Sequence, residues 1–411
     1  MPSAAPALAQ PGFPGSNALP QGGSQRWDYL DQLRAILMLA GIPYHAGLVY
    51  ASHAAWIVDS PDHSTPVTWF IQFSHTFRMP TFFLLAGLFG MLLLRRRGSG
   101  VWWRERLRRL GIPLLTSLLL VSPLLVLASA VAQGGLPNAV PGLLREMQNP
   151  GANWTVHLWF LIYLLLYVTI LAGLWHLRAG LRLEVAITAL QDHVERQPLV
   201  GWLLLVVLGT GTVAVAAVSS QAGVSYLLGG IFVPAEFIAN GLVFLVGALL
   251  AFRPSWLDAF TRPRWPVWLL ALLAATAMAV CQDAEGAASR AASYFLMPIV
   301  GILFAHLLLS ASRRWLDRST PLSRAMVDAA MTMYLVHVVI VLWLAVAFLA
   351  IPLPPEVEIL VIVAVSGALS YGFHRVIRRS PLLLFLFNGV RPPPLWKAAA
   401  SPQLRTSGST P

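Results

Sequence analysis

The first long apolar run of the sequence contains an arginine and a histidine eleven residues apart, Arg34 and His45. In a helix, eleven steps of about 100° make three turns plus about 20°, so both side chains lie on one face, roughly 16 Å apart along the axis. Asp31 lies on the same face and can pair with Arg34. Ionisable groups inside a bilayer are costly, and histidine exchanges protons near neutral pH. The spacing therefore predicts a functional site rather than a packing contact.

A second apolar run contains His75 and Arg78, which share a helix face at i, i+3 spacing. Three further ionisable residues lie in later runs: His157, Glu236 and His337. Their depths predict that the histidines and Arg78 converge in the outer half of one helical bundle, with Glu236 as a counter-ion. A packing role is the alternative for each of them. The runs contain no histidine or carboxylate pair at i, i+3 or i, i+4 spacing, so we predict no metal site.

The residues around these groups are mostly apolar. Hydrophobic residues make up 57% of the 411-residue chain and charged residues 11%, whereas soluble domains carry roughly 25% charge. This composition excludes a soluble globular enzyme, a disordered chain and a disulfide-linked scaffold. The single cysteine, Cys281, also excludes an internal disulfide and any Cys-x-x-Cys motif.

Ten apolar runs approach the length of about 20 residues that a membrane-spanning helix needs. If the N-terminus is cytoplasmic, all but four of the 28 lysines and arginines lie inside; the exceptions are Arg34, Arg78, Arg145 and Arg290. Because cytoplasmic loops are enriched in positive charge, we predict an all-α, polytopic bundle of ten transmembrane helices with both termini cytoplasmic. The predicted spans cover 30–51, 69–94, 110–131, 157–176, 200–219, 226–251, 266–281, 292–310, 325–349 and 357–374.

The net charge of +11 is accounted for by this topology and by contact with the lipid bilayer, so we expect no nucleic-acid partner. Residues 1–25 are rich in Pro, Ala, Gly, Ser and Gln and carry no charge, which predicts a disordered cytoplasmic tail rather than a signal peptide. We expect the membrane domain to cover residues 26–380 and a cytoplasmic C-terminal tail to cover 381–411.

The motifs in these runs resemble those of the acyltransferase-3 membrane family. Arg34-x10-His45 resembles the hallmark of that family, and Arg106-x-x-Arg109, followed by Leu110-Gly111-Ile112-Pro113, resembles its second motif. The resemblance implies an acyltransferase of the bacterial inner membrane with a core of ten spans. One branch of the family is thought to succinylate periplasmic glucans with cytoplasmic acyl-CoA. The segments similar to that branch are 30–35, 41–45, 75–79, 102–103 and 157–160.

The resemblance implies a catalytic group in the outer half of the bundle. Moving an acyl group from a thioester to a sugar hydroxyl needs a base, and we predict His45 for this role. Burial disfavours a charged imidazolium and keeps a histidine available as a base. The tetrahedral intermediate carries an oxyanion, which Arg78 or His75 is expected to stabilise.

The donor and acceptor are expected to bind on opposite sides of this group. No permanently bound cofactor is expected, and acyl-CoA (succinyl-CoA or acetyl-CoA) is the donor substrate. Coenzyme A is polyanionic and suits cytoplasmic arginines, for which we predict Arg34, Arg106 and Arg109. The distance from Arg34 to His45 suits the pantetheine arm. For the glycan acceptor we predict His157, Glu236 and His337.

Two other functions fit the same residues. The first is an O-acetyltransferase that modifies another envelope polysaccharide. The second is a proton-coupled glycan transporter in which the intramembrane histidines relay protons. Other glucan-biosynthesis proteins are possible partners of the succinyltransferase that we favour.

Overall fold

A computed structural model describes residues 28–52, 56–318, 320–351 and 353–391. These residues are almost entirely helical, and their only β-type pairing is a single bridge between Leu227 and Phe232. The predicted all-α class is therefore confirmed. The whole predicted N-terminal tail (1–25), and the C-terminal tail beyond residue 391, lie outside the described residues.

Eight helical stretches of the described chain are long and apolar enough to cross a membrane. They identify a multi-pass membrane protein, as the hydropathy predicts. The stretches are α3 (Thr65–Arg97), Ser99–Gly134, α9 (Trp159–His176), α11 (Pro198–Gln221), α14 (Trp265–Asp283), α15 (Ala287–Trp315), α16 (Pro321–Phe348) and α17 (Pro355–Ile377).

The other two predicted spans have shorter helices. Range 30–51 is divided into α1 (Asp28–Leu39) and α2 (Gly41–Leu48). The break precedes Pro43, whose ring excludes a helical hydrogen bond to the Leu39 carbonyl. Range 226–251 contains only α12 (Pro234–Leu250), because its first residues form a turn. The count of ten spans and the orientation of the termini thus remain predictions.

The stretch Ser99–Gly134 is not one regular helix. It consists of α4 (Ser99–Arg106), the π-helical turn η1 (Leu107–Gly111), α5 (Ile112–Leu120) and α6 (Ser122–Gly134). Pro113, in the first turn of α5, has no backbone N–H and cannot bond the Arg109 carbonyl. The π turn therefore lies where the regular helical ladder is interrupted.

Several shorter helices occur between the spans or after the last one. They are η2 (Leu136–Asn138), α7 (Ala139–Gln148), α8 (Ala152–Thr155), α10 (Leu183–Arg196), α13 (Pro254–Phe260) and α18 (Pro381–Asn388). The last of these opens the segment that we expected to be a tail, and it packs against α5, α16 and α17. The C-terminal segment therefore begins with a packed helix.

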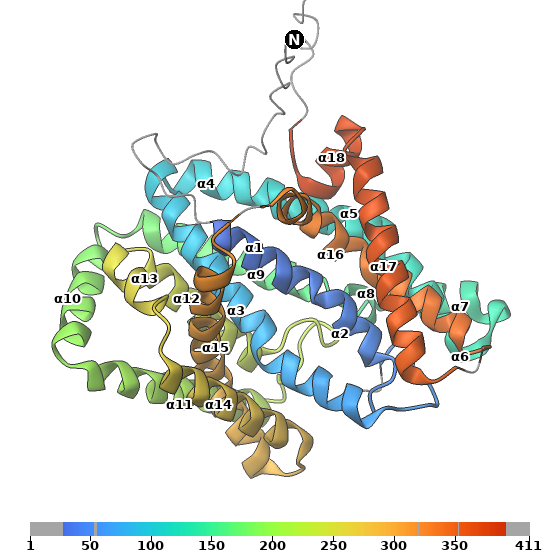
Figure 1. Ribbon diagram of the computed structural model, residues 1–411, viewed down its shortest axis with the longest axis horizontal. Helices are drawn as coiled ribbons and strands as arrows, with labels where there is room; N and C mark the ends of the chain where they lie inside the picture. The colour runs from blue at the N-terminus through green and yellow to red at the C-terminus, as the bar shows by residue number, and fades with distance from the viewer. Residues whose placement is uncertain (1–27, 53–55, 319, 352, 392–411) are drawn as a thin grey trace, which may run out of the picture.

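Helix α3 forms the centre of the bundle and contacts α12, α15 and α14 as well as α2. Its backbone approaches that of α12 closely, since a Cβ atom at Gly87 or Gly247 would overlap a carbonyl oxygen of the other helix. Figure 1 shows α1, α2 and α3 crossing the middle of the molecule, with α10 and α11 at one edge and α6, α7 and α17 at the other. Of the ionisable side chains that the sequence analysis selected on these helices, His45 and Arg78 are buried.

Candidate active site

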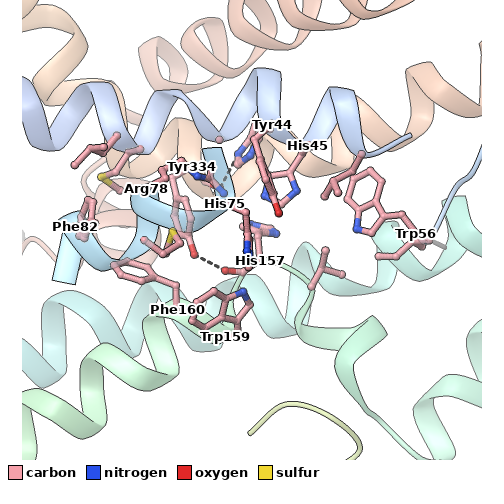
Figure 2. Close-up of a pocket in the computed structure, with 18 of the residues that line it drawn as sticks. Tyr44, His45, Trp56, His75, Arg78, Phe82, His157, Trp159, Phe160 and Tyr334 are labelled. Atoms are coloured by element: carbon pink, nitrogen blue, oxygen red, sulfur yellow. Dashed lines mark hydrogen bonds between the residues drawn. The ribbon is translucent and has the colours of Figure 1, made fainter. Parts of the chain in front are cut away.

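A cavity of about 270 Å³ lies among α1, α2, α3, α9 and α16. Its lining includes five residues predicted from the sequence, and Figure 2 shows four of them turned toward one another. The structure thus brings together ionisable groups from four segments that are far apart in the sequence, as the depth argument predicted. The five residues are His45, His75, Arg78, His157 and His337.

Three of the histidines form a triangle. The ring centroid of His45 lies 6.0 Å from that of His157 and 5.3 Å from that of His337, and the last two are 5.4 Å apart. All three side chains are buried, and Nδ1 of His45 has no hydrogen-bond partner within the described chain. His45 therefore has a buried ring nitrogen that is not engaged by any group of the described chain.

His337 is held in one orientation by the backbone of its own helix. Its Nδ1 lies 2.8 Å from the Tyr334 carbonyl oxygen and 3.1 Å from that of Met333. Because carbonyl oxygens only accept hydrogen bonds, Nδ1 carries the hydrogen and Nε2 is left as an acceptor. This acceptor lies beside Gly41, where a Cβ atom would be 3.3 Å from Nε2.

Arg78 is a buried cation at the cavity wall. Its guanidinium carbon lies 4.1 Å from the centre of the Tyr44 ring, in a cation–π contact. In the part of the chain that the structure describes, its Nε has no hydrogen-bond partner, and no aspartate or glutamate lines the cavity. A buried charge without a carboxylate partner suits the binding of an anionic group.

The structure does not place Glu236 at this cavity. We predicted it near the middle of a span beginning at residue 226, but α12 begins at Pro234, so Glu236 lies in the first turn. It does not line the cavity and forms no ion pair with Arg78. Glu236 is therefore not a direct partner of Arg78 in the described chain, and its predicted role in binding the acceptor stays a prediction.

His75 and His157 reach the cavity from different elements. His75 lies on α3, one turn before Arg78, and its ring is 6.1 Å from the Tyr44 ring. His157 precedes α9, and its carbonyl oxygen accepts a 2.6 Å hydrogen bond from the Tyr334 hydroxyl. The residue before it, Val156, has a positive φ of 38°, which is strained for a β-branched side chain.

Aromatic side chains complete the cavity wall. Trp56 stacks against His45 with ring centroids 5.6 Å apart, and Trp159 and Phe160 close another side, as Figure 2 shows. The sequence analysis did not assign Tyr44, Trp56 or Tyr334 to the site. A signal existed for Tyr334, which lies three residues before His337 on the same helix face. Trp56 lies between helices, where no periodicity identifies its neighbours.

The predicted donor-binding arginines lie outside the cavity, whose lining begins on α1 at Leu37. Arg34 pairs with Asp31 at 3.3 Å, as predicted, and its guanidinium carbon lies 5.6 Å from the Phe89 ring. Arg106 lies over the Trp102 ring at 5.8 Å, and that ring packs on Gly90. Arg34 and Arg106 therefore flank one segment of α3.

Two carboxylate contacts hold the second motif. Glu105 contacts Arg97 of α3 and lies 3.4 Å from Nε of Arg109. The cavity begins at Leu37 and Met38, about one helical turn beyond Arg34. The structure thus separates the predicted residues into an arginine group (Arg34, Arg106 and Arg109) and a histidine cavity, connected along α1.

Comparison with known proteins identifies the family of the chain. The sequence model of the acyltransferase-3 family, an acyltransferase domain, matches residues 27–375, which include every element that lines the cavity. The chain belongs to the acyltransferase-3 family and is an acyltransferase that carries out O-acyl transfer.

Among curated relatives, the chain is similar to Glucans biosynthesis protein C of Escherichia coli strain SMS-3-5 / SECEC and of strain K12. Each is 29% identical over 385 residues, which cover 89% of this chain and 95% of the relative. No solved structure matches the chain significantly.

Proposed function

We propose that this acyltransferase moves a succinyl group from cytoplasmic acyl-CoA to hydroxyl groups of a periplasmic glucan. The proposal places the protein in the bacterial inner membrane, with ten spans and both termini in the cytoplasm. The name of the relatives supports a glucan acceptor, and the distribution of lysine and arginine supports the orientation. In this topology α1 and α2 together form one span of the bilayer, and α12 forms another.

The observation that carries the proposal is the position of the histidine cavity relative to the arginine group. A polyanionic donor suits the arginine group at the inner end of α1. Its thioester then extends along α1, past Met38 and into the cavity beside His45. An acceptor hydroxyl enters the same cavity from the opposite side of the membrane, past Trp56.

His45 acts as the general base in this mechanism. It takes the proton of the acceptor hydroxyl as the hydroxyl oxygen attacks the thioester carbonyl carbon. The carbonyl oxygen becomes an oxyanion, which the Arg78 guanidinium stabilises within a site shielded from water, supported by His75. The carbon–sulfur bond then breaks, the ester remains on the sugar, and the proton on His45 passes to the coenzyme A thiolate.

His157 and His337 support the reacting groups in this account. The carbonyl hydrogen bonds of His337 fix its ring, so that Nε2 can accept a hydrogen bond from an acceptor hydroxyl. His157 is held beside it by the hydrogen bond from Tyr334. Both residues orient the acceptor against His45.

The buried charge of Arg78 favours succinyl over acetyl. A succinyl group ends in a carboxylate, and a buried guanidinium without an acidic neighbour provides the partner that this carboxylate needs. A bound acetyl donor offers that charge no anionic partner until the oxyanion forms. Arg78 therefore stabilises negative charge on the acyl group at either of its ends.

The test is donor choice in isolated membranes. Membranes that contain the protein are incubated with labelled succinyl-CoA or acetyl-CoA and a periplasmic glucan, and mass spectrometry locates the new ester. We expect succinyl esters on the glucan. Acetyl esters alone would overturn the donor assignment, and export of the glycan without covalent change would support a transporter.

A further inference from the structure

Outside the cavity, helix α18 makes a close contact with the turn η1, which contains Arg108 and Arg109. Arg108 Nε donates a 3.0 Å hydrogen bond to the carbonyl oxygen of Gly389, the residue that ends α18. Figure 1 shows α18 beside α17 and near α5. Helix α18 lies beyond residue 375, where the family match ends.

Only glycine fits at the point of contact. Gly389 has a φ of +61°, in the left-handed region that other residues rarely adopt. A Cβ atom there would overlap the carbonyl oxygen of Arg108 and would lie 2.7 Å from the Cα atom of Arg109. The contact is therefore made with the backbone of η1 itself, so any shift of Gly389 moves the turn and not only one side chain.

A buried polar network fixes α18 in this position. The Thr332 hydroxyl donates a 3.0 Å hydrogen bond to Asn388 Oδ1, and His374 Nδ1 lies 3.2 Å from the same hydroxyl. Because the hydroxyl hydrogen is given to Asn388, the hydroxyl oxygen accepts from His374. All three side chains are buried. Buried hydrogen bonds between side chains of different helices favour one packing arrangement of the helices that carry them.

We propose that α18 is a positioning element for the donor site, with Gly389 and Arg108 as positioning residues. It holds η1 so that the side chains of Arg106 and Arg109 present their guanidinium groups to the phosphates of the acyl donor. This inference rests on the proposed use of acyl-CoA. A bidentate arginine contact depends strongly on orientation, so a small rotation of η1 weakens donor binding without changing the reacting groups.

The first test compares two glycine substitutions in the full-length protein, purified in detergent. Gly389→Ala inserts a Cβ atom against η1, whereas Gly372→Ala on α17 places one in open space. Calorimetry measures the Kd for coenzyme A, and an acylation assay measures KM and kcat. We expect Gly389→Ala to raise Kd and KM about tenfold, as for one misaligned charge-assisted hydrogen bond, with kcat within about twofold of wild type. Gly372→Ala should match wild type.

A second pair of variants tests the buried network and guards against misfolding. Thr332→Ser keeps the hydroxyl and should bind coenzyme A like wild type, whereas the similarly shaped Thr332→Val loses it and should weaken binding. A wild-type Kd for coenzyme A in both Gly389→Ala and Thr332→Val would overturn the proposal. So would an equal loss of kcat and of affinity in these variants. The proposal also fails if both variants can be recovered only as unfolded protein. If wild type itself fails to bind coenzyme A, the proposed donor is wrong and this inference fails with it.

Discussion

At the scale of single residues, Gly41 leaves the space into which the side chains of Arg78 and His337 pack. A Cβ atom at this position would lie 3.2 Å from Arg78 Nη1 and 3.3 Å from His337 Nε2. Both distances are tighter than ordinary carbon contacts, and both neighbours are buried. The guanidinium and the imidazole therefore occupy space that exists because residue 41 has no side chain.

Gly41→Ala should consequently lower turnover without preventing insertion. We expect kcat to fall about 10-fold, less than the roughly 100-fold that a misplacement of about 1 Å can cost, because the neighbours need to move by less than that. The measurement is the rate of ester formation at saturating donor, normalised to protein in the membrane. Gly367→Ala, where a Cβ atom meets nothing within 4 Å, is the matched control. A wild-type rate in Gly41→Ala would mean that this packing does not matter for catalysis.

Arg78 allows a second prediction at this scale. If its guanidinium pairs with the terminal carboxylate of the acyl group, Arg78→Gln should shift the ratio of kcat/KM for succinyl-CoA over acetyl-CoA by about tenfold toward acetyl-CoA. The two donors are compared in the same membrane preparation. An equal loss of kcat/KM with both donors would mean that Arg78 stabilises only the oxyanion and does not bind the terminal carboxylate.

At the scale of elements, helix periodicity predicted much of the site. Arg34 and His45 were predicted on one helix face; His45 lines the cavity, together with Met38 and Gly41 between them. The i, i+3 pair of His75 and Arg78 lies together as predicted.

Periodicity did not locate the groups that approach from other elements. Glu236 was predicted near the middle of a helix but lies in the first turn of α12, because the start of that helix depends on a turn and not on hydropathy. Trp56 and the contact of Gly389 with η1 join segments distant in sequence, and no pattern within one helix carries that information. The roles of the site residues remain predictions.

The arginine group provides the prediction at this scale. Alanine at Arg106 or Arg109 should raise the KM for acyl-CoA by about tenfold. Lysine should raise it by less, because it keeps the positive charge and loses only the planar guanidinium that can donate two parallel hydrogen bonds. The kinetics of both substitutions at each site provide the check. Wild-type KM in both alanine variants would mean that these arginines serve only membrane orientation.

At the scale of the whole molecule, the distribution of charge predicts which side of the membrane each connection faces. Cysteines introduced one at a time test it, in a background where the single native cysteine is replaced by Cys281→Ser. Gly134→Cys should react with an impermeant thiol reagent in intact spheroplasts, and Ser99→Cys only after permeabilisation. These positions are the two ends of one helical stretch. The reverse labelling would contradict ten spans with cytoplasmic termini.

The central claim is that His45 is the base for acyl transfer within the cavity. His45→Gln retains hydrogen-bonding capacity but cannot accept the proton, so the decisive measurement is ester formation by the purified variant with succinyl-CoA and glucan. We expect a loss of about 100-fold to 10,000-fold at normal abundance in the membrane. His193→Ala, an exposed histidine on α10, should retain wild-type turnover. Substantial turnover by His45→Gln would contradict the account and leave the histidine with a structural role.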